Sequence, residues 1–396
     1  MIMSNNAHQA SDLKQMQSLP LEAKIRMTKE RIKVWYESWT RFEIFDTATG
    51  KTRFETIDTR DFRAEPTLKA TEYIRSALPG QVYVSFSGGK DSTVLKHIVD
   101  SMYDDVPALF VNTGLEYPEI QKFVKEVQSG KYDCFNSDVK IVRPEMRFDE
   151  VIKNYGYPVV SKEVAKNVYY ARTGGEKNVH YKKLFGLLTY NGEKSQFCSD
   201  NWKFLYDSDF LISQRCCDVM KKKPSKVYSK QTGRKSIVAT MASEGRQRYI
   251  AWVRSGCNAF EGKTPRSAPL SFWTEQDILH YIKKYDVPYC SVYGEIQVKH
   301  NEDNFEGQIN LIDYLGCYEP EDILETTGCD RTGCIFCMFG CHLEKEPNRF
   351  QSLKKTHPRQ YQYCIGGGEM VDGKWQPSKE GLGLGKVLDY IGVKYE

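Results

Sequence analysis

Residues 82–95 of this 396-residue chain place a short apolar run, a glycine turn and a helical pattern in direct succession. Val82, Tyr83 and Val84 favour a β-strand, which stops at the segment Ser-Gly-Gly-Lys-Asp-Ser (residues 87–92). Apolar residues at helical spacing follow in residues 94–99. A strand that turns through glycines into a helix directs backbone N–H groups and a helix N-terminus at one point. The stretch therefore predicts a phosphate-binding loop.

Seven residues at this turn are expected to contact the nucleotide: Ser85, Ser87, Gly88, Gly89, Lys90, Asp91 and Ser92. The glycines permit close backbone approach, and Lys90 supplies a positive charge for phosphate oxygens. Asp91 is the nearest carboxylate for Mg²⁺, although an acidic residue at a helix start can also serve only as a cap. The spacing differs from that of a Walker A loop, which has four residues between its glycines.

Strand and helix patterns continue to alternate along the chain. We expect strands at 108–112, 139–142 and 236–241, and helices at 117–127, 148–155 and 274–285. Such alternation predicts an α/β fold with a doubly wound, mostly parallel sheet. Ligands of such sheets bind beyond the carboxyl ends of the strands, where Ser87, Asn112 and Thr240 fall.

The chain is expected to have three parts. An N-terminal helical extension spans 1–79, with helices at 19–39 and 65–78 and a hairpin through 42–59. The nucleotide-binding α/β domain spans 80–295. The third part, 296–396, comprises an insertion and a cysteine-rich C-terminal region, and the irregular stretch that indicates the insertion runs over 294–325.

Charge and hydropathy limit the class of protein. The 56 Lys and Arg residues exceed the 52 Asp and Glu residues by a formal net charge of +4, which argues against a protein that coats nucleic acid. We find no apolar run of membrane-spanning length, and residues 1–14 lack the apolar stretch of a secretory signal. We therefore expect a cytoplasmic protein without a membrane partner.

The twelve cysteines are unevenly spread. Cys216 and Cys217 are adjacent, and a second group lies close together: Cys329, Cys334, Cys337 and Cys341. In a reducing compartment such groups indicate metal or iron–sulfur ligation rather than disulfides. A structural Zn²⁺ site is the simpler alternative to an iron–sulfur cluster.

The segment 87–92 resembles the PP-loop of the ATP pyrophosphatases, the adenine nucleotide α-hydrolase-like superfamily. Three further segments are similar to motifs of the phosphoadenosine phosphosulfate reductase family: residues 110–119, 240–248 and 269–278. The resemblance covers about residues 80–345. It implies nucleotide contacts by Asn112, Thr113, Gly114, Thr240, Glu244 and Arg248. It also implies catalytic roles for Lys90, Asp91 and Arg246.

Family members that reduce adenylylsulfate carry a Cys-Cys pair and a later Cys-x-x-Cys that together hold a 4Fe–4S cluster. The resemblance therefore implies Cys216, Cys217, Cys334 and Cys337 as ligands. A local alternative uses Cys329, Cys334, Cys337 and Cys341, since the sulfur-activating ATPase of DNA phosphorothioation, another relative, also groups cysteines near this end.

Three functions follow from the resemblance. The first is cleavage of ATP, with Mg²⁺, to AMP and pyrophosphate, which activates an acceptor for iron–sulfur-assisted sulfur transfer. The second is reduction of adenylylsulfate or its 3′-phosphorylated form to sulfite, which in the family uses a C-terminal cysteine; the last thiol here is Cys364. The third is a regulatory protein that only binds nucleotide.

We expect sulfur transfer to need a donor such as a cysteine desulfurase, and a homo-oligomer is compatible with the sequence. A nucleic acid is one candidate acceptor. Cations and aromatic residues interleave in residues 349–363, which predicts a surface for its backbone and bases: Arg349, Phe350, Lys354, Lys355, His357, Arg359, Tyr361 and Tyr363. An amphipathic helix with a solvated basic side explains the same pattern.

Overall fold

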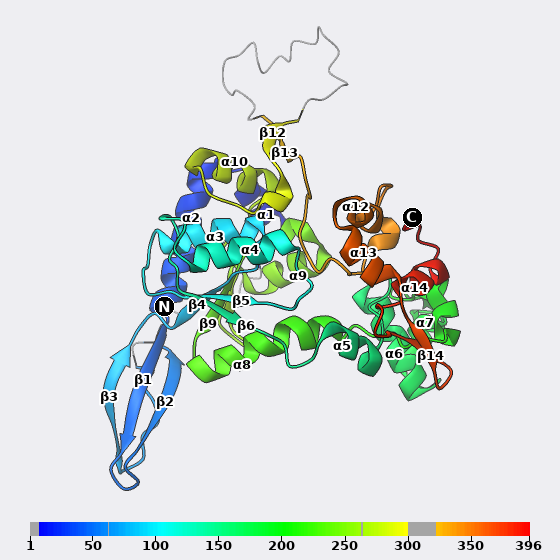
Figure 1. Ribbon diagram of the computed structural model, residues 1–396. Coiled ribbons are helices and arrows are strands. Elements are labelled where there is room, and N and C mark those ends of the chain that lie inside the picture. Colours follow the sequence, from blue (N-terminus) through cyan, green and yellow to red (C-terminus); the bar gives the residue numbers. More distant parts are fainter. Residues whose placement is uncertain (1–7, 62, 263, 300–321) are drawn as a thin grey trace. The chain divides into compact units, whose positions relative to one another are not determined.

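The computed structural model describes residues 8–61, 63–262, 264–299 and 322–396 (Figure 1). They form two units, each built from separate stretches of the chain. Unit 1 comprises Met1–Phe110, Pro118–Ile141 and Val227–Thr332, and unit 2 comprises Val111–Tyr117, Val142–Lys226 and Gly333–Glu396. Most of the insertion expected at 294–325 lies outside the described residues.

A six-stranded sheet in the order β10-β11-β9-β4-β5-β6 forms the centre of unit 1. Its strands are β4 (Val82–Ser85), β5 (Ala108–Val111), β6 (Val139–Val142), β9 (Lys235–Val238), β10 (Asn258–Ala259) and β11 (Arg266–Ser267). β4 pairs in parallel with β5 and β9, and β9 with β11, whereas β10 is antiparallel. The central strand β4 reads Val-Tyr-Val because both of its sides are buried.

Helices cover both sides of this sheet, as expected for a doubly wound fold. They are α3 (Lys90–Asp100), α4 (Pro118–Gln128), α8 (Lys223–Thr232), α9 (Arg246–Ser255) and α10 (Glu275–Tyr285). Figure 1 shows α3 and α4 on one side and α8 on the other. Tyr228 of α8 meets Tyr83 of β4 edge to face, with ring centroids 5.1 Å apart. The predicted fold class is confirmed.

The two N-terminal helices, α1 (Ala10–Gln17) and α2 (Leu21–Glu37), belong to unit 1. The buried ammonium of Lys24 on α2 donates to both carboxylate oxygens of Asp277 on α10 at 2.8 Å. The indole Nε1 of Trp273 donates to the Thr28 hydroxyl at 2.9 Å. These buried polar contacts fix α2 against the nucleotide domain.

A three-stranded antiparallel sheet follows α2, in the order β2-β1-β3. Its strands are β1 (Trp39–Asp46), β2 (Lys51–Asp58) and β3 (Glu72–Leu78). The hairpin expected at 42–59 is confirmed, but the helix expected at 65–78 is wrong. Helix-favouring residues there are overridden because β3 pairs with β1, from Asp46 opposite Glu72 to Arg41 opposite Leu78. A second small ribbon joins β12 (Ile296–Val298) to β13 (Leu324–Thr326).

Unit 2 is mainly helical. Its helices are α5 (Phe148–Tyr155), α6 (Lys162–Gly174), α7 (Val179–Leu184), α12 (Arg349–Thr356), α13 (Pro358–Ile365) and α14 (Leu384–Tyr390). Two hairpins join β7 (Thr189–Tyr190) to β8 (Glu193–Lys194) and β14 (Glu369–Val371) to β15 (Lys374–Gln376). A π-helical turn at Asp218–Lys222 follows the Cys216-Cys217 pair and leads into α8.

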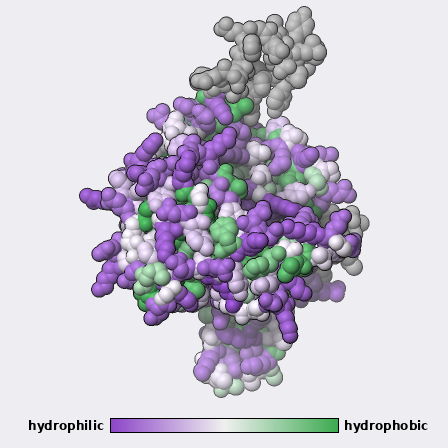
Figure 2. Space-filling model, turned by 90° about the vertical axis from the view of Figure 1, so that its right-hand side faces the viewer, coloured by the Kyte–Doolittle hydropathy of each residue, from purple (hydrophilic) through white to green (hydrophobic). Residues whose placement is uncertain are grey.

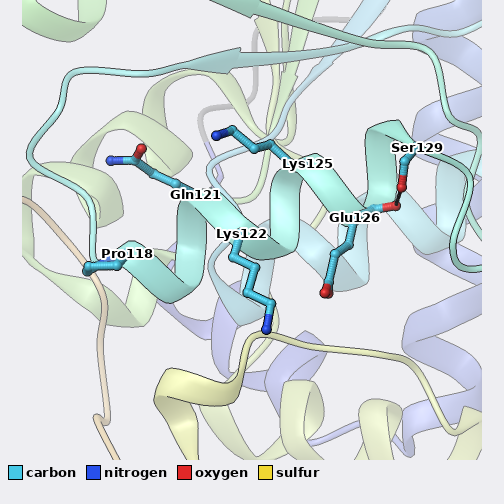
Figure 3. A pocket seen from close by; sticks show the side chains of 6 residues that line it. All are labelled: Pro118, Gln121, Lys122, Lys125, Glu126 and Ser129. Atoms are coloured by element: carbon cyan, nitrogen blue, oxygen red, sulfur yellow. Dashed lines mark hydrogen bonds between the residues drawn. The ribbon is translucent and has the colours of Figure 1, made fainter.

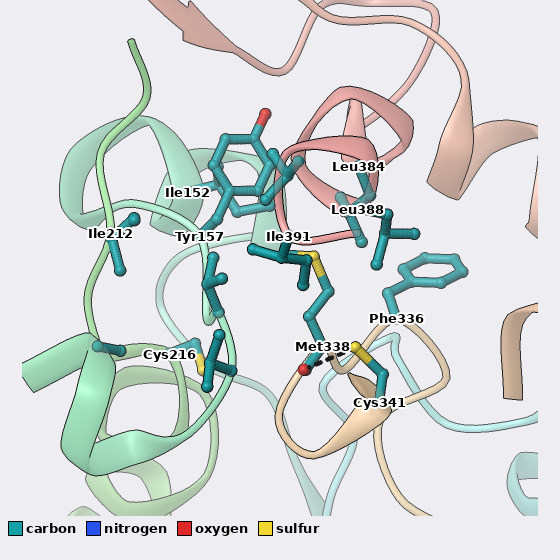
Figure 4. Close-up of a cluster of buried hydrophobic side chains, with 14 of the residues drawn as sticks. Ile152, Tyr157, Ile212, Cys216, Phe336, Met338, Cys341, Leu384, Leu388 and Ile391 are labelled. Atoms are coloured by element: carbon teal, nitrogen blue, oxygen red, sulfur yellow. Dashed lines mark hydrogen bonds between the residues drawn. The ribbon is translucent and has the colours of Figure 1, made fainter. Parts of the chain in front are cut away.

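The core of unit 2 joins segments that lie far apart in the sequence. Figure 4 shows Tyr157 and Ile212 together with Phe336, Met338 and Leu388. The Tyr157 hydroxyl donates to the Leu382 carbonyl at 2.8 Å. This packing holds the residues after Gly333 against the residues around Cys216, so the two cysteine segments belong to one core. Across the described part of the chain, no helix is both long and apolar enough to cross a membrane.

Candidate functional site

The loop between β4 and α3 is held closed by its own serines. The amide of Ser87 donates to the Ser92 hydroxyl at 3.1 Å, and the two hydroxyl oxygens lie 3.0 Å apart. The Ser92 hydroxyl also donates to the Gly89 carbonyl at 2.9 Å. Ser85 ends β4, and Gly89 precedes the first residue of α3, so the turn leads straight into the helix N-terminus.

The two glycines of the loop leave no room for side chains. Gly88 has φ +74°, and a Cβ there would lie 2.9 Å from the side chains of both Ile120 and Val124. A Cβ on Gly89 would lie 2.9 Å from the Thr332 hydroxyl. At Gly88 the backbone therefore takes a path that other residues could follow only with strain, whereas at Gly89, with φ −76°, only the space taken by the Thr332 hydroxyl limits a side chain.

Lys90 lies at the start of α3 with a side chain that is only 4% exposed. Its ammonium donates to the Asp330 carbonyl at 2.6 Å and lies 3.1 Å from Glu275 Oε1. Its backbone amide donates to the Tyr293 hydroxyl at 3.1 Å, and that hydroxyl lies 2.6 Å from the Thr332 hydroxyl. Residues of the 275–332 stretch thus orient the loop cation.

Asp91 follows with one buried, unpartnered oxygen. Its Oδ1 has no hydrogen-bond partner and lies 3.9 Å from the Lys90 ammonium. Burial raises the pKa of this carboxyl, while the charges of Lys90 and Arg331 oppose the shift. A buried carboxylate oxygen without a hydrogen-bond partner is suited to a divalent cation.

Glu244 forms ion pairs with two arginines near the loop. Its carboxylate pairs with Arg248 of α9 and with Arg331, the latter at 2.5 Å. The charges of Arg248 and Arg331 also act on Asp91, so these four groups lie close together. Arg246 is exposed at the first position of α9.

Thr240 lies just beyond the carboxyl end of β9 and lines a cavity of about 140 Å³. Arg248, Trp252, Cys257, Arg266 and Ser271 line it with Thr240. Unit 1 therefore brings together the predicted residues from the PP-loop and from the 240–248 segment.

The predicted residues Asn112, Thr113 and Gly114 follow β5 and belong to unit 2. The Asn112 side-chain oxygen accepts from the Gly114 amide at 3.0 Å. The amide and hydroxyl of Thr113 donate to the buried Glu116 carboxylate at 3.1 and 2.6 Å. This turn is preformed, and Glu116 is its organising residue.

Four cysteines of unit 2 line one small cavity. Cys216, Cys217, Cys334 and Cys337 surround it, with Leu115, Phe148, Pro158, Met220 and Lys221. The thiols of Cys216 and Cys217 lie 3.9 Å apart, and the Cys337 amide donates to the Cys334 carbonyl at 3.0 Å. The Ile335 amide donates to the Leu115 carbonyl at 2.8 Å, which anchors the Cys-x-x-Cys turn.

These thiols differ in acidity. The hydrogen bond from Cys216 lowers the pKa of Cys217, and the charge of Lys162 acts in the same direction, although burial opposes the shift. The same hydrogen bond raises the pKa of Cys216, and burial raises the pKa of Cys334 to about 11. Burial alone would lower the pKa of Lys221, but the charges of Cys334 and Glu116 raise it. Lys221 is therefore a protonated ammonium beside the four thiols that line the cavity.

The set Cys329, Cys334, Cys337 and Cys341 is arranged differently. Cys329 belongs to unit 1, where its amide donates to the Val292 carbonyl at 3.0 Å. The buried Cys341 thiol donates to the Met338 carbonyl at 3.0 Å, as Figure 4 shows. In the described residues, no group of three or more histidine, cysteine or carboxylate side chains is arranged to hold a metal ion. The four thiols nevertheless fit a cluster chemically, because they share a cavity and sulfur is the ligand that iron–sulfur clusters take.

The aromatic residues of the surface expected at 349–363 do not support that expectation. Phe350 is 0% and Tyr361 8% exposed, because both pack into the core of unit 2. Among the residues of the expected surface, Lys354, Lys355 and Arg359 are exposed, whereas His357 and Tyr363 are half-buried. The amphipathic-helix alternative describes this segment better.

Figure 3 shows a separate hollow along α4, lined by Pro118, Gln121, Lys122, Lys125, Glu126 and Ser129. It contains none of the predicted site residues, and we assign it no role.

Sequence patterns did not single out Tyr293, Glu275, Arg331 or Thr332 as site residues. Glu275 was visible only as part of the segment 269–278. Arg331 and Thr332 lie between Cys329 and Cys334, where the pattern pointed only to the thiols, and Tyr293 lies in a segment without a motif. The contact of Tyr293 with the loop spans 203 positions, a separation at which no local pattern gives a signal.

The parallel sheet, the glycine loop at the carboxyl end of β4 and the buried Lys90 define a PP-loop nucleotide-binding protein. A model of the phosphoadenosine phosphosulfate reductase domain matches residues 81–173 and 178–338. The chain therefore belongs to this family. The more specific likeness to the phosphorothioation ATPase stays a prediction.

Two curated relatives come from Methanocaldococcus jannaschii. The uncharacterized protein MJ0973 is 28% identical over 135 residues, which cover 34% of this chain and 31% of that protein. The uncharacterized protein MJ0066 is 38% identical over 79 residues, 19% of this chain and 15% of that protein. The matches thus span less than a third of either relative.

Among solved structures, the phosphoadenylyl-sulfate reductase of Candida auris, in a phosphate complex, is similar at 14% identity over 53% of this chain and 75% of that chain. Its TM-score of 0.31 is too low for that likeness to carry a conclusion.

Proposed function

We propose that this protein cleaves ATP between its α- and β-phosphates, releases pyrophosphate and so activates an acceptor for sulfur transfer. The observation that carries the proposal is the pairing of Lys90 and Asp91 at the start of α3. A buried ammonium lies 3.9 Å from a buried carboxylate oxygen that has no hydrogen-bond partner. The first suits phosphate oxygens, and the second suits Mg²⁺ bound to them.

In the proposed reaction the protein positions the ATP and the acceptor and stabilises the charge of the leaving pyrophosphate. An acceptor oxygen attacks the α-phosphorus, the bond from that phosphorus to the bridging oxygen breaks, and pyrophosphate leaves with the electron pair. Backbone N–H groups of the loop and the Lys90 ammonium are proposed to stabilise the leaving charge. The Lys90 amide, which donates to the Tyr293 hydroxyl at 3.1 Å, would have to exchange that partner for a phosphate oxygen. Asp91 would hold Mg²⁺ on the phosphates, and Arg246, exposed at the start of α9, is proposed to meet the α-phosphate. A sulfur nucleophile then displaces AMP from the activated acceptor.

Cys216, Cys217, Cys334 and Cys337 are proposed to hold a 4Fe–4S cluster, which supplies a site that can carry sulfur or electrons. The protein's own contribution is the cavity around the thiols and the Lys221 cation beside them. Zn²⁺ is the alternative occupant, and the set with Cys329 and Cys341 is the alternative ligand arrangement. The sulfur donor is proposed to be a persulfide-generating enzyme such as a cysteine desulfurase.

Reduction of a sulfonucleotide is the second candidate, favoured by the family to which the chain belongs. That reaction needs an accessible nucleophilic thiol. Cys364, on α13, is 0% exposed, and its burial raises the pKa of the thiol well above its usual range. This observation ranks the reductase below ATP cleavage.

Product analysis after incubation with Mg²⁺ and ATP tests the proposal. We expect AMP and pyrophosphate with the native protein and neither with Asp91→Asn. Formation of ADP and phosphate would contradict cleavage at the α-phosphorus. Release of sulfite from adenylylsulfate, with no AMP from ATP, would establish the reductase instead.

A further inference from the structure

One side of α6 presents two cations and an aromatic ring in a row. Lys162, Lys166 and Tyr170 are spaced four residues apart, so they lie on the same side of the helix. All three are exposed, whereas the opposite side of α6, which includes Val164 and Val168, is buried in the core.

The segment after α6 continues this surface. The His180 ring of α7 stacks on Tyr170, with centroids 5.0 Å apart and planes at 25°. The Lys183 ammonium lies 5.5 Å from the ring centroid of Phe197. We call the residues Lys162, Lys166, Tyr170, His180, Lys183 and Phe197 the α6–α7 face.

Buried Asn167 joins the parts of the α6–α7 face. Its side chain lies 2.8 Å from His180 Nδ1 and donates to the Ser199 hydroxyl at 3.1 Å. The charges of Lys166 and Lys183 both act on His180, so these three side chains are neighbours. The face is therefore one connected surface on a rigid support, although its residues come from two helices and a loop.

The charge of this segment is strongly one-sided. Residues 162–204 contain eight Lys and Arg against four Asp and Glu, a surplus as large as the net charge of +4 of the whole chain. Large aromatic rings are exposed among these cations: Tyr170 is 38%, Phe197 47% and Tyr190 76% exposed. Figure 2, which views the side where Figure 1 draws α7, shows hydrophilic side chains with separate hydrophobic patches between them.

The α6–α7 face also reaches the cysteine cavity within unit 2. Lys162, the first residue of α6, is close enough to Cys217 for its charge to act on that thiol. Pro158, four positions earlier, lines the cavity. The row of side chains on α6 thus runs from the cavity to the exposed rings.

We infer that the α6–α7 face binds single-stranded nucleic acid and presents it to the cysteine cavity as the sulfur acceptor. Cations beside exposed rings suit a flexible strand, because lysines take the phosphates and the unpaired bases stack on Tyr170 and Phe197. An acidic protein segment would satisfy the lysines but would have no flat groups to cover the rings. The acceptor role rests on the proposed function; the binding itself does not.

Fluorescence anisotropy of a labelled single-stranded oligonucleotide, as DNA and as RNA, tests the inference with the full chain. Tyr170→Ala and Phe197→Ala are each expected to weaken binding about 5-fold to about 150-fold, the effect of losing one stacked base. The matched control is Lys354→Gln with Lys355→Gln on α12, which removes two exposed cations outside the face and should leave affinity unchanged. Thermal melting of each variant excludes loss of folding.

Salt dependence provides a second readout. Lys166→Gln with Lys183→Gln should lower the slope of log affinity against log salt by about 1.4, since each lysine on a single strand contributes about 0.7. Equal affinity of native protein and face variants, or loss only in the α12 control, would overturn the inference. So would a poly-glutamate peptide that binds the face as tightly as the oligonucleotide does.

The ATP assay separates this inference from the proposed function. AMP production without oligonucleotide binding would overturn the acceptor surface alone. Binding that depends on the α6–α7 face without AMP production would leave the surface in place and overturn the proposed function.

Discussion

The Lys90 ammonium donates to the Asp330 carbonyl at 2.6 Å, a contact between residues 240 positions apart. With Glu275 at 3.1 Å on its other side, the ammonium of the PP-loop is held by the protein itself. Phosphate oxygens would have to share or replace these partners. The position of the loop cation is thus set by the protein before a phosphate binds, at the cost of exchanging a partner when it does.

Replacing Lys90 with methionine should remove ATP cleavage while leaving the fold intact. Methionine keeps the buried chain but lacks the charge, and loss of one such group typically costs about 100-fold or more in rate. Glu275 is about half exposed, so it is not left as a buried, unpaired charge. Pyrophosphate release measures the effect, and Lys122→Met, at an exposed site on α4, is the control. Native activity in the Lys90 variant would exclude this residue from the reaction.

Gly88→Ala should destabilise the protein more than Gly130→Ala. Both glycines have positive φ, +74° and +75°, so each substitution carries the backbone cost of about 1–2 kcal/mol. Only at Gly88 would the new Cβ also meet Ile120 and Val124 at 2.9 Å, which adds about 1 kcal/mol or more. Urea unfolding compares the two free energies of unfolding. Equal decreases in the free energy of unfolding for the two variants would show that the loop and its neighbours shift to accommodate the added methyl group at Gly88.

The loop was predictable from sequence because every part of it is local. The apolar run at 82–84, the glycines and the following helical spacing lie within eighteen residues, 82–99. The partners of the loop were not predictable, since Tyr293, Asp330 and Thr332 reach it only through the tertiary fold.

Two differences between expectation and structure have the same cause. β3 pairs with β1 although its residues favour a helix, and Phe350 faces the core although Arg349 and Lys354 lie near it in sequence. Pairing and burial decided both outcomes, and neither is visible in a short window of sequence.

Removing one partner of the buried Lys24–Asp277 pair should cost about 3 kcal/mol of stability. Asp277→Asn leaves the Lys24 ammonium, whose side chain is 4% exposed, without its countercharge. The double variant Lys24→Met with Asp277→Leu should recover part of the loss, although it also removes the hydrogen bonds that Asp277 accepts from Thr274. Chemical denaturation of the three variants gives the comparison. A single variant as stable as the native protein would show that α2 is not anchored by this pair.

The cysteine arrangement predicts which substitutions remove a bound cluster. Serine at any of Cys216, Cys217, Cys334 or Cys337 should abolish iron content and the brown absorbance near about 400 nm. Serine at Cys329 or Cys341 should preserve both. The reverse pattern, with colour lost at Cys329 and Cys341 but kept at Cys216 and Cys217, would establish the local ligand set. Stoichiometric zinc without iron in the native protein would show that the four cysteines hold a structural zinc ion and not a cluster.

The most direct test of ATP cleavage follows the α-phosphorus itself. Native protein with Mg²⁺ and ATP labelled at the α-phosphate should place all of the released label in AMP or an adenylated acceptor, with one pyrophosphate formed for each. Lys90→Met and Asp91→Asn should form neither. Label that appears in ADP, or no turnover with any acceptor including single-stranded nucleic acid, would contradict the account.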